Sequence, residues 1–201
     1  PTTPELLVAG GSRIATFDGT SWSDIDGTPD DFAYALAIWD RDADGPEAAS
    51  VCAVGNFEST SAAPFTGVAR WTGSDWDSLS PSPLHPFPIL SMVNALVAGD
   101  PDGPGPAPTG LTMISHNGGR ECSFWDGAQW NLWTTGLQAP LYAATFGDPD
   151  GPGPIGNRVI IGGNANPGPP AWRDTYGWQP LGSGLVGTAS RFALWDPDGD
   201  G

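Results

Sequence analysis

An acidic turn that ends in glycine recurs four times along this chain, and this recurrence constrains the fold more than any other feature. The turns begin at Asp40, Asp100, Asp148 and Asp196 and end at Gly45, Gly105, Gly153 and Gly201. Each turn follows a short apolar run, and the first three also precede one. A motif that returns at one phase indicates an array of one supersecondary unit. The units are 1–45, 46–105, 106–153 and 154–201.

Each unit repeats one succession of short segments. The apolar run before the turn has apolar residues at both odd and even positions, which predicts a strand buried on both faces. These runs are 32–39, 91–98, 141–146 and 190–195. A second strand follows the turn, in 5–11, 50–56, 110–115 and 158–163. A hairpin comes last, in 14–22, 68–76, 122–130 and 171–178.

The hairpins carry their own turn signal. Asp-Gly between apolar segments predicts a tight hairpin turn, and it occurs at Asp18 and Asp126. The fourth hairpin has lost Asp-Gly, and its two aromatic residues, Trp172 and Trp178, are one residue further apart than in the other units. We therefore expect a β-bulge there.

Four strands in a unit of this length are typical of one blade of a β-propeller. Pro and Gly interrupt most windows in which a helix could form. The chain therefore predicts one all-β domain over 1–201, a β-propeller of four blades with four antiparallel strands each. A β-sandwich with irregular hairpins is the alternative, although a sandwich does not require a recurring unit.

Three short segments carry a resemblance to a known family. Residues 6–11 read Leu-Leu-Val-Ala-Gly-Gly, 67–73 read Gly-Val-Ala-Arg-Trp-Thr-Gly, and 181–184 read Leu-Gly-Ser-Gly. Together with the acidic turn, this pattern resembles the kelch-like β-propeller repeats of secreted bacterial proteins of the planctomycete type. The resemblance covers essentially the whole chain and implies a propeller in an extracellular or cell-surface location. Most propellers of that kind have more blades than the four units found here.

The resemblance also implies how the first blade is completed, because rings of that family combine strands from both ends of the chain. Residues 191–195 would complete the sheet that 6–9 begin. The completing strand could come from the same chain or from a neighbouring one. The second case would give head-to-tail self-association.

The net charge of the chain limits the classes of molecule that it is expected to bind. The formal net charge is -16, and all seven basic side chains are Arg. Such a surface repels nucleic acid and anionic membranes and attracts divalent cations. No apolar run approaches the ~20 residues of a membrane span, so we expect no membrane insertion.

Alternate aspartates in the acidic turns predict calcium sites, because hard oxygen ligands at alternate positions of a tight turn suit Ca²⁺. Two turns have three such ligands, namely Asp40, Asp42 and Asp44, and Asp196, Asp198 and Asp200. Two turns have a proline in place of the third ligand and keep Asp100 and Asp102, and Asp148 and Asp150. In the alternative interpretation, these residues serve only to set the turn conformation.

The tryptophans fall into two groups. Trp22, Trp76, Trp130 and Trp178 recur at one position of the unit, which predicts packing between blades. Trp39 and Trp133 lie outside that pattern and are candidates for stacking on sugars, since aromatic rings present apolar faces. The two cysteines, Cys52 and Cys122, are expected to be small buried residues, with a disulfide between neighbouring units as the alternative.

Residues that carry catalysis are sparse. His85 and His116 lack metal-ligand spacing, and no nucleophile elbow is present. A glycosidase carboxylate pair is the least favoured reading. We therefore expect no enzyme activity, and a calcium-stabilised extracellular structural protein that forms the repeating subunit of a surface filament. The alternative is a propeller module that binds glycans or proteins.

Overall fold

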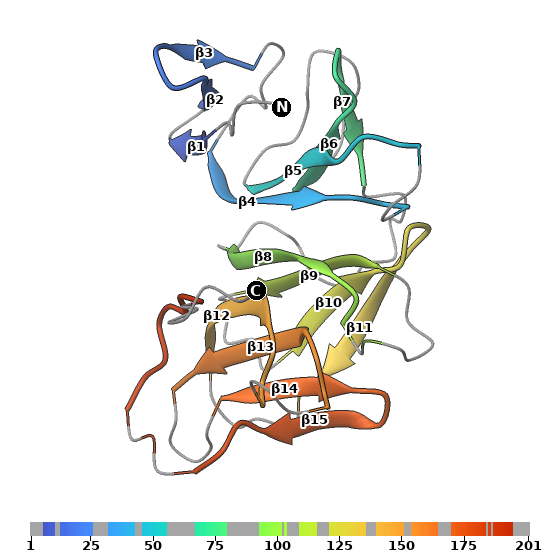
Figure 1. Ribbon diagram of the computed structural model, residues 1–201, viewed down its shortest axis with the longest axis vertical. Coiled ribbons are helices and arrows are strands. Elements are labelled where there is room, and N and C mark those ends of the chain that lie inside the picture. The colour runs from blue at the N-terminus through green and yellow to red at the C-terminus, as the bar shows by residue number, and fades with distance from the viewer. Residues whose placement is uncertain are drawn as a thin grey trace.

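The computed structural model describes residues 6–10, 13–25, 32–42, 46–55, 67–79, 93–101, 103, 109–115, 121–135, 140–150, 154–164, 170–183, 185 and 187–194. These residues form β-strands β1 to β15 and no helix. The strands make four antiparallel sheets, of which the first two lie at one end of the long axis of the molecule and the last two at the other (Figure 1). The all-β prediction is therefore confirmed, and the arrangement of the sheets is propeller-like.

The sheets form strictly in chain order. The first sheet has three strands, β1 (Leu6–Gly10), β2 (Arg13–Phe17) and β3 (Trp22–Asp24). The second has β4 (Ala33–Trp39), β5 (Ser50–Gly55), β6 (Val68–Trp71) and β7 (Trp76–Ser78). The third has β8 (Val93–Gly99), β9 (Gly110–Ser115), β10 (Glu121–Trp125) and β11 (Trp130–Thr134). The fourth has β12 (Leu141–Gly147), β13 (Arg158–Gly163), β14 (Ala171–Asp174) and β15 (Gly177–Pro180).

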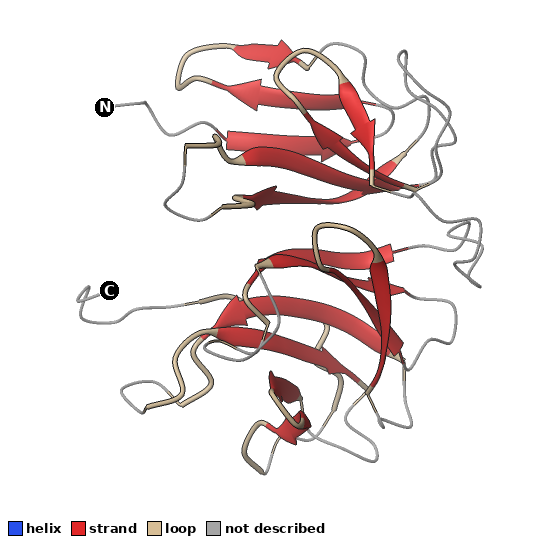
Figure 2. Cartoon of the chain, turned by 90° about the vertical axis from the view of Figure 1, so that its right-hand side faces the viewer, coloured by secondary structure: helices blue, strands red, loops and turns tan. Residues whose placement is uncertain are grey.

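We call β4, β8 and β12 the leading strands, because each is the first strand of a four-stranded sheet. β4 contacts β8 and β8 contacts β12, so the leading strands hold successive sheets together (Figures 1 and 2). All three carry the same irregularity, since the register with the next strand shifts around Tyr34, Asn94 and Tyr142. A bulge at one position strengthens the local twist in every sheet. The repeat in the sequence is thus also a repeat in structure.

Three apolar cores lie between successive sheets. The first joins the first and second sheets and includes Ile14 and Trp76, both almost fully buried. The second joins the second and third sheets through Trp39 and Leu111. The third joins the third and fourth sheets and contains Leu141, Val159 and Ile161, together with Ile114 and Cys122. Each sheet is therefore stabilised by its neighbours in the array rather than by a core of its own.

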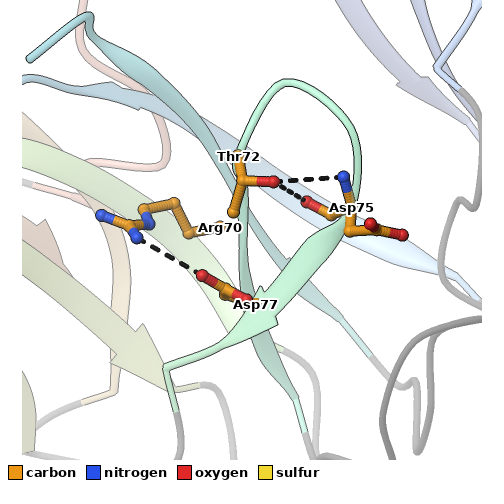
Figure 3. Close-up of polar contacts among 4 residues, drawn as sticks. All are labelled: Arg70, Thr72, Asp75 and Asp77. Carbon is orange, nitrogen blue, oxygen red and sulfur yellow. Dashed lines mark hydrogen bonds and ion pairs between the residues drawn. The ribbon is translucent and has the colours of Figure 1, made fainter.

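In all four hairpins, the side chain of the first turn residue accepts hydrogen bonds from the backbone of the turn. Oδ1 of Asp18, Asp126 and Asp174 accepts hydrogen bonds from the backbone N–H groups two and three residues ahead, at 2.7–2.9 Å. In the second hairpin Thr72 takes this position, and its Oγ accepts from the N–H of Asp75 at 3.1 Å (Figure 3). Short polar side chains that bond to their own backbone favour turns.

The fourth hairpin differs from the expectation of a bulge. Its register runs without a shift from Ala171 opposite Pro180 to Asp174 opposite Gly177. The turn has the same length as in the other hairpins, because Trp178 follows Asp174 by four residues as Trp130 follows Asp126, and Arg173 rather than an aromatic residue lies opposite Trp178. The wider spacing of the two aromatic residues arises because Trp172 lies one position earlier on its strand, opposite Gln179, and not because a residue is inserted.

The strand expected to complete the first sheet is not formed in this structure. Residues 190–194 have no strand conformation, and β1 pairs only with β2 among the described residues. Residues 189–194 lie against the fourth sheet instead, where Leu194 packs over Gly147 and Phe192 over Gly162. Trp195 lies outside the described residues.

Candidate functional site

The acidic turns are the first candidate site, and the structure describes part of each of three. Asp40, Asp42, Asp100, Asp148 and Asp150 are described. The predicted ligands outside the described residues are Asp44, Asp102, Asp196, Asp198 and Asp200. Within the described part of the chain, no group of three or more His, Cys, Asp or Glu side chains is placed to hold a metal ion.

Two of the turns share one hydrogen-bonding pattern. Asp40 Oδ1 accepts from the N–H of Asp42 at 3.3 Å, and Asp148 Oδ1 accepts from the N–H of Asp150 at 2.9 Å. The second carboxylate reaches five residues ahead, because Asp42 Oδ2 accepts from the N–H of Glu47 at 3.0 Å. Asp150 accepts from the N–H of Ile155 at 3.3 Å in the same way. The backbone thus holds alternate carboxylates in place in both turns.

One oxygen of the first turn lacks a partner. Asp42 Oδ1 is buried and has no hydrogen bond among the described residues. Burying a polar atom without a partner destabilises the folded state, and the effect is larger for a charged group. A cation bound beside this oxygen would satisfy it. Oxygen atoms of alternate aspartates are the ligand type that Ca²⁺ takes, so the residues present fit this ion.

The turn at Asp148 also places two carboxylates close together. Removal from water raises the pKa of Asp150, and the neighbouring Asp148 raises it further through a shared hydrogen bond and its negative charge. A divalent cation would relieve this repulsion, because an opposite charge favours the ionised carboxylate.

The turn at Asp100 differs, because an arginine of the fourth sheet reaches it. A Cβ added to Gly103 would collide with the guanidinium of Arg158, so the two groups are in close contact. Arg158 is 8% exposed and donates from Nη1 to the carbonyl of Asn157 at 2.7 Å. A positive charge therefore already lies at this turn. Arg158 is the first residue of β13, the strand that follows an acidic turn. The equivalent strands β5 and β9 begin with Ser50 and Gly110, so the repeat pattern alone did not reveal the arginine.

The two tryptophans considered for sugar stacking both pack against other side chains. Trp39 is 2% exposed and belongs to the core between the second and third sheets. Trp133 stacks on Phe124 at 4.6 Å between ring centroids, and the guanidinium of Arg173 lies over its ring at 4.5 Å. Trp39 therefore offers no free face to a sugar, and Trp133 is partly buried by its two neighbours.

The recurring tryptophans pack as expected in part. Trp76 is 1% exposed, and Trp130 donates from Nε1 to the carbonyl of Leu79 at 2.6 Å, which links the third sheet to the second. Trp22 packs on Phe17 but remains 54% exposed. The first sheet therefore covers its aromatic pair less completely than the others do.

Other polar groups hold the hairpins in shape. Arg70 lies opposite Asp77 with 3.4 Å between Nη2 and Oδ2 (Figure 3). Asp77 is 57% exposed, and pairs of this kind contribute little to stability in water. Thr72 Oγ also donates to the carbonyl of Asp75 at 2.9 Å. These contacts fix the turn of the second hairpin.

Cys52 and Cys122 are buried and do not form the disulfide that was the alternative. Burial raises the pKa of Cys52 to about 12, although the nearby charge of Arg70 opposes this. A thiol with so high a pKa is a poor nucleophile at neutral pH. His85 and His116 lie outside the described residues.

The described residues contain no helix long and apolar enough to cross a membrane. No known family model matches the chain, and no curated protein shows significant similarity to it.

Proposed function

We propose that this chain is a non-catalytic structural protein: an extracellular, four-bladed β-propeller, stabilised by calcium, that self-associates as the repeating subunit of a surface filament. The observation that carries the proposal is the unequal number of strands in the sheets. Among the described residues, the first sheet has three strands where the others have four, and residues 189–194 pack as a leading strand would without belonging to a sheet. A strand from 191–195, of the same chain or a neighbouring one, would complete the first blade.

Calcium is proposed for the acidic turns, above all the turn at Asp40. The buried Oδ1 of Asp42, which has no hydrogen-bond partner among the described residues, supports a cation at that turn. The raised pKa of Asp150 supports one at the turn at Asp148. Calcium there would fix the connection between a leading strand and the next strand, and it would reduce the repulsion within a chain of net charge -16.

The proposal is tested by electron microscopy of the purified protein in calcium, with magnesium at the same concentration as the control, and again after chelation. We expect filaments in calcium that disassemble on chelation and re-form when calcium is restored. Isolated particles under all conditions would contradict the structural role. Filaments that withstand chelation would keep the structural role and contradict calcium at the joints.

A binding module for glycans or proteins is the second candidate, and one observation favours it. Tyr176 is 94% exposed at the tip of the hairpin between β14 and β15. An exposed aromatic ring at a hairpin tip is available to stack on a sugar or to enter a protein interface. Binding of a glycan that is lost in Tyr176→Ala, while the fold is retained, would favour this function.

A further inference from the structure

We propose that residues 189–194 of a second copy of this chain add to the free edge of β1 and cover the exposed apolar side chains of β4. This inference rests on the proposed function and names the joint between subunits. It is carried by three features of the described residues: an open strand edge, an uncovered apolar face beside it, and a segment that matches both.

The open edge belongs to β1. β5, β9 and β13 are the strands that follow an acidic turn, and each pairs with a leading strand on one side and a hairpin strand on the other. β1 is their counterpart, because Ala9 opposite Ile14 corresponds to Val54 opposite Val68. Among the described residues β1 has only the hairpin partner, β2. An unpaired edge of this kind is a template for another strand.

The uncovered apolar face belongs to β4. β4 contacts β1 as β8 contacts β5 and β12 contacts β9, so the sheets are stacked alike. The difference is that, among the described residues, no leading strand lies beside β1 to cover β4 as β4 covers β8. Phe146 of β12 packs over Gly99 of β8, and Ala98 of β8 packs against the core that contains Trp39 of β4. Ile38, at the same position of β4, is 52% exposed, and Tyr34 is 40% exposed. A leading strand beside β1 would cover both.

The matching segment is 189–194. Leu194 packs over Gly147 as Phe146 packs over Gly99, so this segment lies where the leading strand of a following sheet would lie. The N–H of Ala189 donates to the carbonyl of Gly163 at 2.8 Å, and Thr188 forms a bridge with Asn164. Leu194 is nevertheless 65% exposed, and no strand pairs with residues 190–194 among those described. The segment therefore has room for a partner.

The partner must come from another copy in this arrangement. Residues 189–194 lie against β12 and β13 of the fourth sheet, whereas β1 contacts β4 of the second, so in this arrangement the segment does not add to β1 of its own chain. The register between β4 and β5 predicts which residues would lie opposite each other across the joint. Ile38 lies opposite Val51 and Leu36 opposite Ala53. The corresponding pairs across the joint are Leu194 with Leu6, and Phe192 with Val8. Addition of a strand to a free edge supplies main-chain hydrogen bonds and makes the contact specific.

The test uses two full-length variants with one introduced cysteine each, Leu6→Cys and Leu194→Cys, mixed in calcium and oxidised mildly. Opposed residues of antiparallel strands have Cα atoms about 4.5–5.5 Å apart, which suits a disulfide. Leu7→Cys mixed with Leu194→Cys is the matched control, because the adjacent register position belongs to the other face of the strand. The native thiols are buried and should not compete. Peptide mass spectrometry identifies the linked residues.

We expect a disulfide between position 6 of one chain and position 194 of another, at least tenfold more than in the control mixture. No such product, or equal yields in both mixtures, would overturn the proposal. The double variant Leu6→Cys/Leu194→Cys at high dilution supplies a second check. A disulfide within one monomer would show closure of the ring by its own strand and would also overturn the second-copy joint.

The two proposals can fail separately. Cross-linked dimers that form no filaments would support the joint and contradict the filament. Filaments with no disulfide between positions 6 and 194 would support the filament and overturn this joint.

Discussion

At the scale of single residues, the acidic turns divide by what lies beside their carboxylates. Asp42 Oδ1 is buried without a partner among the described residues, whereas the turn at Asp100 lies against the guanidinium of Arg158. The same sequence motif therefore has two environments, one that lacks a positive charge and one that already has it. We expect calcium to favour the turn at Asp40 over the turn at Asp100.

The first prediction concerns Asp42→Asn. The substitution removes the charge while it keeps an acceptor for the N–H of Glu47. We expect the increase in melting temperature on addition of calcium to fall to half or less of that of the original chain, measured by scanning calorimetry. Asp77→Asn, on an exposed hairpin strand, is the control and should keep the full increase. An unchanged response in Asp42→Asn would contradict a site at this turn.

The second prediction concerns pH and the hairpin turns. Partial burial alone would raise the pKa of Asp126, but hydrogen bonds from the N–H groups of Gln129 and Ala128 and from Asn131 outweigh it and lower the pKa below 3.8. A lowered pKa means that the carboxylate stabilises the fold at neutral pH and loses this effect as pH falls through the folded pKa.

The variant Asp126→Asn isolates the charge, because the amide oxygen can still accept the backbone hydrogen bonds. We expect it to lower the free energy of unfolding by about 1 kcal/mol at pH 7. The difference from the original chain should shrink below pH 4 in urea titrations. Thr72→Ala alters the equivalent turn without a titrating group, so its effect should not depend on pH. A pH-independent effect of Asp126→Asn would contradict the prediction.

At the scale of elements, the leading strands decide how closely successive sheets approach. Gly99 ends β8 under the ring of Phe146, and Gly147 ends β12 under Leu194. A side chain at either glycine would push the following segment away. The bulge near the start of each leading strand recurs because all three strands have to fit the same neighbours.

The third prediction concerns Gly99→Ala. A Cβ there would lie 2.5 Å from Cδ2 of Phe146, well inside van der Waals contact. Overpacking of this kind destabilises a protein by about 1–3 kcal/mol. We expect that loss in chemical denaturation, and we expect the double variant Gly99→Ala/Phe146→Leu to be less unstable than the sum of its single changes. Strict additivity of the two changes would mean that this contact does not set the spacing of the sheets.

At the scale of the whole molecule, a net charge of -16 is carried by an array whose sheets rely on their neighbours. Like charges repel across the folded chain and oppose compactness, and salt screens this repulsion over about 10 Å at 0.1 M. The array should therefore be most sensitive to the ionic medium where an outer sheet meets solvent, as at the first sheet with its exposed Trp22.

The fourth prediction separates screening from binding. Raising NaCl from 10 to 200 mM should raise the melting temperature by a few degrees through screening alone. Calcium at a few millimolar should raise it further than magnesium chloride or NaCl of equal ionic strength, because site binding adds to screening. Equal effects of all three salts would show that the acidic turns attract cations only as a diffuse cloud.

The sequence by itself determined the repeating unit, the order of its strands and the all-β class, because these depend on local alternation, turn residues and spacing. It also located the acidic turns and the recurring aromatic pairs. Tertiary structure alone decided which faces are covered. The apolar residues in 32–39 predicted burial on both sides, yet Tyr34 and Ile38 are exposed, since none of the described strands takes the place of a leading strand before β4.

Burial is a property of neighbours, and neighbours distant in sequence leave no local signal. The same reason applies to Trp39 and Trp133, which were expected to be available to a ligand. Trp39 is buried in the core between two sheets, and Trp133 packs against Phe124 and Arg173. It also explains why Arg158 was not singled out: only the packing of the fourth sheet on the third brings its charge to the turn at Asp100. The chain encodes its unit locally, and the contacts between units decide which surfaces remain open.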